Sequence, residues 1–347
     1  MLHPFREPDE RHVCPRGSHG HRVVPSLSIG RDSEASDLRK VKAVSRGKTV
    51  NPALKTRALR GKAREKKQPR PSATTVYALG RDPLESARLQ RQSDELGPFS
   101  ATVLDQVQLK PGQRAIDLGC GPSGILQLLS DRVAPGGRVV GVDADPIHVT
   151  MARQFAEEHG LRNVDIVAAD ATHTGLPAGS FDLVHARTLL VNVPDPAEVV
   201  AEMVRLARPG GWIVSVEPDM EYGLCYPAHP AFDRIGALFH AAFRRNGADP
   251  FIGRRLTELY REAGLEEIGV EARASVHPAG DSRRTIRLDL MRSLRPVILE
   301  RGLADERELD ELDRVARAHL ANPQTLIMPS LFFLAWGRRP TTAAAQR

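Results

Sequence analysis

Residues 116–124 read IDLGCGPSG, and this stretch decides the fold class. The apolar segment Arg114–Leu118 predicts a short buried strand before the glycines, while the apolar residues from Ile125 onward recur at helical spacing. Glycines between a strand and a helix let the backbone approach a ligand closely, and the start of the helix offers free N–H groups. The G-x-G-x-x-G pattern therefore indicates a cofactor-binding loop, although dinucleotides and other nucleoside cofactors both use it.

Strands and helices alternate along the chain on both sides of this loop. Helices are expected between the strands, and two of them begin with an aspartate N-cap followed by proline. Five strands separated by helices predict an α/β fold with a doubly wound, Rossmann-like parallel sheet that is covered on both faces. The five short apolar runs lie at 114–118, 138–142, 164–167, 181–186 and 212–216.

Other parts of the chain depart from this alternation. A helical lead-in is expected over about 75–108, divided into two helices by Gly97-Pro98. After the fifth strand the pattern loosens, and helical segments are expected within two insertions at about 220–250 and 280–325. A last strand is expected at 330–337. We expect the two insertions to cover a substrate site.

The net charge of +6 is unevenly distributed. Residues 1–71 contain 18 Lys and Arg against 7 Asp and Glu, whereas residues 72–347 contain 31 against 36. The first segment also has few large apolar residues, so we expect a disordered basic N-terminal extension followed by one folded domain over 72–347. Because that domain is mildly acidic, no nucleic-acid partner is expected for it.

No apolar run is long enough for a transmembrane helix, and the first residues lack the apolar segment of a secretory signal. Three scattered cysteines, Cys14, Cys120 and Cys225, predict neither a disulfide framework nor a thiolate metal site. These features predict a cytoplasmic protein that binds no membrane and needs no metal. The oligomeric state is left open, with a homodimer as one alternative.

Carboxylates stand at the ends of three successive strands. Asp143 lies 22 residues after Gly121, at the end of the second strand, where a carboxylate can accept both hydroxyls of a ribose. Asp117 precedes the first glycine by two residues and would repel a pyrophosphate but attract an ammonium group. Asp170 ends the third strand, where it could accept a hydrogen bond from an adenine amino group. Together these acids favour a nucleoside cofactor that carries an amino group.

The chain resembles the class I S-adenosylmethionine-dependent methyltransferases over roughly residues 75–340. The resemblance rests on IDLGCGPSG, VVGVDAD, AADAT, FDLVHARTLL and LARPGGWIVSVEPD, in the order and spacing of that family. It implies a seven-stranded sheet whose last strand is antiparallel and lies beside the fifth. This sequence departs from the family pattern at Pro122-Ser123, because proline removes one N–H donor from the loop.

The resemblance also implies S-adenosylmethionine as the cofactor and assigns roles to residues of this chain. The glycine loop would hold the methionine part, Asp143 the ribose, and Asp170 the adenine, while Asp117 would organise the loop. Tyr77 and Gln92 in the lead-in would close over the methionine end. The predicted cofactor-binding residues are Tyr77, Gln92, Asp117, Gly119, Cys120, Gly121, Asp143, Ala144, Asp170, Ala171 and Arg187.

Methyl transfer from a sulfonium is an in-line displacement, so the protein must align the acceptor and, for a protonated acceptor, provide a base. His185 in the fourth strand is the candidate base because its ordinary pKa is near 6.5. Arg187 could contact cofactor or acceptor, or form a structural ion pair. The candidate acceptor contacts lie in or near the expected cover and are Asp219, Tyr222, His229 and Phe239.

Three functions are compatible with the sequence. The first is methylation of O, N or C of a small aromatic or apolar metabolite, in bacterial specialised metabolism given the arginine-rich composition. The second is methylation of RNA or protein recruited by the basic extension, against which the acidic domain and the helical cover argue. The third is an NAD(P)-dependent oxidoreductase that uses the same loop, against which Asp117 and Asp170 argue.

Overall fold

The computed structural model describes residues 83–341, and side chains from residue 88 onward. The predicted extension over 1–71 and the candidate cofactor residue Tyr77 lie outside the described residues. The described part is built on a seven-stranded sheet with strand order β3-β2-β1-β4-β5-β9-β7. Its strands are β1 Arg114–Leu118, β2 Arg138–Asp143, β3 Val164–Ala168, β4 Phe181–Arg187, β5 Ala207–Asp219, β7 Glu266–Ala274 and β9 Leu331–Arg338.

The pairing pattern confirms the predicted fold class. Strands β1 to β5 pair in parallel with one another, whereas β9 is antiparallel to both of its neighbours, β5 and β7. The chain order reverses between β1 and β4, so the helices that follow these two strands leave on opposite faces of the sheet. A crevice at the carboxyl ends of the strands is the usual ligand position in such a sheet.

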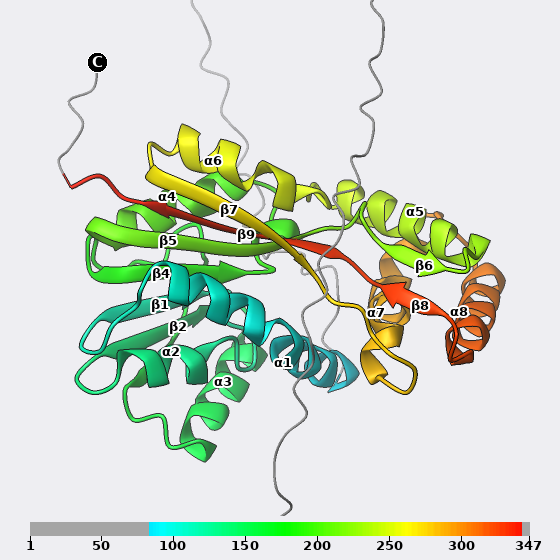
Figure 1. The fold of residues 1–347 in the computed structure, drawn as a ribbon, viewed down its shortest axis with the longest axis horizontal. Coiled ribbons are helices and arrows are strands. Elements are labelled where there is room, and N and C mark those ends of the chain that lie inside the picture. The colour runs from blue at the N-terminus through cyan, green and yellow to red at the C-terminus, as the bar shows by residue number, and fades with distance from the viewer. Residues whose placement is uncertain (1–82, 342–347) are drawn as a thin grey trace, which may run out of the picture. The chain divides into compact units, whose positions relative to one another are not determined.

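Helices cover both faces of the sheet, as Figure 1 shows. Neighbouring strand residues point to opposite faces: Ala115 belongs to one buried cluster and Ile116 to the other. The first cluster includes apolar residues of α1, α2 and α3, and the second includes those of α4 and α6. These helices are α1 Pro83–Gln106, α2 Leu126–Val133, α3 Pro146–Glu158, α4 Pro196–Leu206 and α6 Leu256–Glu262.

The lead-in is one helix, so the predicted division at Gly97-Pro98 is wrong. Helix α1 continues through Pro98, although a proline inside a helix removes one backbone hydrogen bond. Its residues on either side of the proline, including Leu96 and Phe99, are buried against the sheet face. This burial offsets the lost hydrogen bond, and the local sequence alone does not show it.

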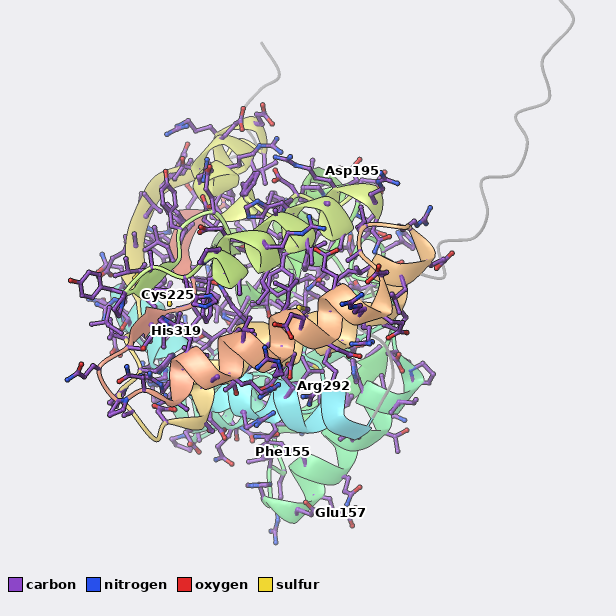
Figure 2. The ribbon with its side chains drawn as sticks, turned by 90° about the vertical axis from the view of Figure 1, so that its right-hand side faces the viewer. Phe155, Glu157, Asp195, Cys225, Arg292 and His319 are labelled. Carbon is purple, nitrogen blue, oxygen red and sulfur yellow. The ribbon has the colours of Figure 1, made fainter. Side chains whose placement is uncertain are left out.

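The remaining elements gather beyond the carboxyl ends of the strands and form a cover (Figure 1). Figure 2 views the cover face on, with Cys225 of β6 and His319 of α8 near each other at one side. The two-stranded pair of β6 and β8 was not predicted, because each strand has only three residues. The cover consists of β6 Leu224–Tyr226, α5 Pro230–Arg245, α7 Ile286–Glu300, α8 Glu306–Ala321 and β8 Leu326–Met328.

None of the helices within residues 83–341 combines the length and the apolar character needed to cross a membrane.

Candidate functional site

The glycine loop between β1 and α2 is tightly constrained by its neighbours. Gly119 has a φ of +67°, and a Cβ placed there would lie 2.8 Å from Cδ1 of Leu189. Gly124 also has a positive φ, and a Cβ there would collide with the carboxylate of Asp117. That carboxylate accepts a hydrogen bond from the Ile125 backbone N–H at 3.1 Å. The loop therefore requires glycine at both positions, and the Asp117 carboxylate organises the loop through its bond to Ile125.

Asp117 is held in turn by His185, which was the candidate base. The two residues are paired neighbours on β1 and β4, and Nδ1 of His185 lies 2.8 Å from Oδ1 of Asp117. The other ring nitrogen lies 3.4 Å from Oγ of Ser100 on α1. His185 has no exposed surface and lines neither of the cavities described below. The structure therefore does not support His185 as the base, and its position makes it a support for Asp117.

The carboxyl ends of β1 to β4 surround the first of two cavities, which we call the cofactor cavity. Oδ2 of Asp143 accepts from the Gly121 N–H at 2.8 Å, and this bond ties β2 to the glycine loop. Asp170 accepts from the backbone and hydroxyl of Thr172 at its own strand end. The cavity is lined by predicted residues that include Gly119, Gly121, Asp143, Ala144, Asp170, Ala171 and Arg187.

The shape and chemistry of the cofactor cavity fit S-adenosylmethionine. A Cβ built on Gly121, whose φ is +57°, meets no atom within 4 Å, so the backbone there is open to a ligand. Asp143 and Asp170 offer carboxylates to a ribose and an adenine amino group. Between the loop and α1 lies a smaller extension of the cavity, lined by Gln92, Asp117 and Cys120 among others. Apart from Tyr77, every predicted cofactor residue thus borders this space.

Arg187, at the end of β4, fastens α1 over the glycine loop. Its Nη2 donates to Oγ of Ser93 at 2.9 Å and to the carbonyl of Gly124 at 3.2 Å. Burial lowers the pKa of Arg187 to about 10, while Asp117 and Asp94 oppose the shift. Arg187 therefore stays charged at neutral pH and joins helix, loop and strand beside the cavity.

A second, mainly apolar cavity lies between α1 and the cover. It encloses about 930 Å³ of space free of protein atoms, including the solvent at its mouth. Three residues, Leu89, Thr188 and Asn192, line both this space and the cofactor cavity. The two cavities therefore adjoin. The apolar wall includes Leu96, Phe99, Val191, Phe239, Phe243, Leu290 and Phe332.

Asn192 presents an unpartnered acceptor at the junction of the two cavities. Its Nδ2 donates to the Thr188 carbonyl at 2.7 Å, whereas its Oδ1 is buried and has no hydrogen-bond partner. A buried acceptor without a partner is unusual, and a water molecule or a ligand group that binds there would satisfy it. Sequence reasoning missed Asn192, because an asparagine after a strand is most simply explained by a turn.

Glu217, at the end of β5, positions the turn that carries Asn192. Its carboxylate accepts from the backbone N–H groups of Leu189, Leu190 and Val191 at 2.9, 3.0 and 3.2 Å. Complete burial raises its pKa to about 7, although these three hydrogen bonds oppose the shift. No role could be assigned to Glu217 from the sequence, because a buried carboxylate that holds a neighbouring turn has no local sequence signal.

The structure separates the four candidate acceptor contacts. Phe239 lines the apolar cavity, and its contact with the acceptor stays a prediction. Asp219 does not line this cavity: it has no exposed surface, and Arg254 holds both of its carboxylate oxygens. Tyr222 is 49% exposed and packs under the same guanidinium. His229 caps α5 by accepting from the Ala231 N–H. The acceptor roles expected for Asp219, Tyr222 and His229 are therefore not supported.

Comparisons with known proteins agree on methyltransferases. A family model described as a methyltransferase domain matches residues 109–263. Nocamycin O-methyltransferase of Saccharothrix syringae is 40% identical over 141 residues, which are 41% of this chain and 47% of that protein. Demethylmenaquinone methyltransferase of Geobacillus kaustophilus is 30% identical over 181 residues, 49% of this chain and 77% of that protein. An uncharacterized 37.1 kDa protein in transposon TN4556 of Streptomyces fradiae is 34% identical over 174 residues, 50% of this chain and 49% of that protein.

The chain belongs to the class I S-adenosylmethionine-dependent methyltransferases. The family, and the cofactor that the resemblance implied, are thereby confirmed, and the oxidoreductase alternative is set aside. The chain spans about half the length of two of these relatives, 49% and 47%.

Proposed function

We propose that this protein transfers the methyl group of S-adenosylmethionine to O, N or C of a small, apolar or aromatic metabolite. The observation that carries this proposal is the apolar cavity that adjoins the cofactor cavity and shares Leu89, Thr188 and Asn192 with it. An acceptor in the first cavity and a cofactor in the second would meet at these three residues, as an in-line displacement requires.

The residues of the cofactor cavity have separate tasks in this proposal. Asp143 binds the ribose hydroxyls, Asp170 binds the adenine amino group, and the glycine loop accommodates the methionine part. When bound, the cofactor supplies an electrophilic methyl group on a sulfonium. Arg187 and Ser93 keep α1 closed over this end of the site and so exclude water.

Asn192 is the proposed positioning residue for the acceptor. Its free Oδ1 can accept a hydrogen bond from an O–H or N–H group, and its Nδ2 bond to Thr188 fixes that orientation. The acceptor atom that carries this hydrogen would then lie where the two cavities meet. Glu217 keeps Asn192 in place through the three backbone hydrogen bonds of its turn.

A small acceptor is favoured over RNA or protein. The cavity is lined by phenylalanine and leucine side chains under a helical cover, whereas enzymes that act on nucleic acids need an accessible basic groove. Two relatives are named for small molecules, nocamycin and demethylmenaquinone. Specialised metabolism in a reducing cytoplasm fits the arginine-rich composition and the few scattered cysteines.

Transfer of tritium from methyl-labelled S-adenosylmethionine tests the proposal. We expect label in the organic extract with at least one of a panel of hydroxynaphthoates and hydroxyanthraquinones, and none with Asp143→Ala. With that acceptor, Asn192→Ala should lower kcat by roughly tenfold or more, since it removes one orienting hydrogen bond. Label that enters added RNA or protein, with none in the extract, would contradict the proposal.

A further inference from the structure

Arg287, in the first turn of α7, lines the apolar cavity without a carboxylate partner. Its Nε donates to the Pro329 carbonyl at 2.6 Å, and its Nη2 lies 3.5 Å from the Met220 carbonyl. No acidic side chain among residues 88–341 forms an ion pair with it, and burial lowers its pKa to about 10. At neutral pH Arg287 therefore places a largely buried positive charge on the cavity wall, and its hydrogen-bond partners there are two backbone carbonyls.

The other charged residues of the cavity do not neutralise Arg287. Glu95 is the one carboxylate that lines this cavity in the described part of the chain, and its Oε1 lies 2.8 Å from Nε2 of His277. Burial raises the pKa of Glu95, and His277 and Arg283 oppose that shift. Arg88 also lines the cavity and donates to Gln92 at 2.6 Å. Arg287 thus keeps its positive charge without a carboxylate partner on the mainly apolar wall of the cavity.

Arg287 lies at the end of the cavity away from the cofactor. The cofactor cavity shares Leu89, Thr188 and Asn192 with the apolar cavity, whereas Met220 and Arg287 are shared with a hollow on the outer side, between α5 and β6. A Cβ at Gly223 in this hollow would collide with the guanidinium of Arg287. Figure 1 shows α7 within the cover, beyond the strand ends. A molecule that fills the cavity would therefore present one end to Asn192 and the other to Arg287.

We propose that the methyl acceptor is an apolar molecule with an anionic group, and that Arg287 binds this group while the atom to be methylated lies beside Asn192. A carboxylate suits the planar guanidinium, which can donate two parallel hydrogen bonds to it. The inference rests on the proposed function, because it takes the apolar cavity to be the acceptor site. Arg287 is then the residue that determines specificity for anionic acceptors.

Matched ligands that differ only in charge test this inference. The probes are 6-hydroxy-2-naphthoate and 6-hydroxy-2-naphthamide, titrated calorimetrically into the full chain that is saturated with S-adenosylhomocysteine. We expect the carboxylate to bind roughly tenfold more tightly than the amide, because a buried charge-assisted pair replaces a neutral one. Arg287→Met should reduce this preference to about one, whereas Arg287→Lys should retain part of it.

Two controls separate binding from folding. Arg292→Met removes an exposed arginine of the same helix that does not line the cavity, and it should leave the preference unchanged (Figure 2). Thermal unfolding and S-adenosylhomocysteine affinity, measured on every variant, should match the wild type if the fold is intact.

The outcomes for the inference and for the proposed function differ. Equal affinities for the two probes in the wild type, binding of neither, or a preference that survives in Arg287→Met would overturn the inference. If the wild-type chain does not bind S-adenosylhomocysteine when no naphthoate is present, the proposed function is overturned instead. Even then, if the wild-type chain prefers the carboxylate probe and Arg287→Met abolishes the preference, Arg287 would be shown to bind anions in this cavity.

Discussion

Contacts between distant parts of the chain fix the titratable side chains near the site: His185 holds Asp117, and Arg254 holds Asp219. Asp117, Asp143 and Asp170 could be predicted because each ends a strand of a recognisable pattern beside a glycine loop. The roles of His185 and Asp219 could not, because the sequence does not show that one contacts Asp117 and the other Arg254. A titratable side chain near a site is catalytic only if it reaches the cavity.

Glu217 gives the clearest prediction at the level of the residue. Because burial raises its folded-state pKa from the ordinary 4.5 to about 7, the fold prefers the neutral acid. The neutral acid contributes on the order of 3 kcal/mol to the free energy of unfolding. This contribution is fully present below pH 4.5 and is lost as the pH rises through 7. Glu217→Gln should therefore show a weaker decline of stability between about pH 5 and pH 8 in urea unfolding.

The exposed residue Glu262 on α6 provides the matched control, since Glu262→Gln removes a carboxylate that lines none of the cavities described here. It should follow the wild-type pH dependence. If Glu217→Gln also followed it, the neutral state of Glu217 in the fold would be refuted.

At the level of the element, α1 is the helix that we propose closes the site, and Arg187 joins it to the glycine loop. The sequence predicted a helical lead-in because its leucines recur at helical spacing, but it predicted a break at Pro98. The contacts that hold α1 come from distant parts of the chain: Arg187 from β4, the Gly124 carbonyl, and His277 after β7. Such contacts have no signal in a local sequence window.

Arg187→Met should therefore release α1 from the glycine loop. It removes hydrogen bonds from a buried charged group, so we expect S-adenosylhomocysteine to bind roughly tenfold more weakly, about 1.4 kcal/mol. Hydrogen exchange of the amides in 88–106 should become faster in the same variant. Arg208→Met, which removes the ion pair with Asp182 at the amino end of β4, should change neither. Unchanged exchange in Arg187→Met would contradict the proposed closure.

At the scale of the whole molecule, the sequence predicted the sheet and its helical layers because each element carries its own apolar period and turn signals. The assembly of the cover could not be predicted from the sequence. Short strands such as β6 and β8, and the way α5, α7 and α8 enclose a cavity, depend on packing between segments up to a hundred residues apart. The apolar cavity itself was thus not predicted, although the two insertions were expected to cover a substrate site and two of its lining residues, Gln92 and Phe239, were named.

Removal of the basic segment over residues 1–71 distinguishes a methyltransferase that acts on a small molecule from one that acts on RNA or protein. If the acceptor is a small molecule held in the apolar cavity, a chain that lacks this segment should methylate it with unchanged kcat/KM. The full chain and the shortened chain should be compared with the same labelled cofactor and the same acceptor. The same comparison is made with RNA as the acceptor. A large loss of turnover in the shortened chain, above all with RNA, would indicate recruitment by the basic segment.

Calorimetric titration of S-adenosylhomocysteine tests the central claim most directly. We expect micromolar-range binding to the full chain and loss of binding in Asp143→Ala, which removes the carboxylate proposed to bind the ribose and its bond to Gly121. Asp165→Ala, an exposed change on the adjacent strand β3, should bind as the wild type does. Failure of the wild-type chain to bind, or equal binding by Asp143→Ala, would contradict the cofactor site and the methyl transfer proposed from it.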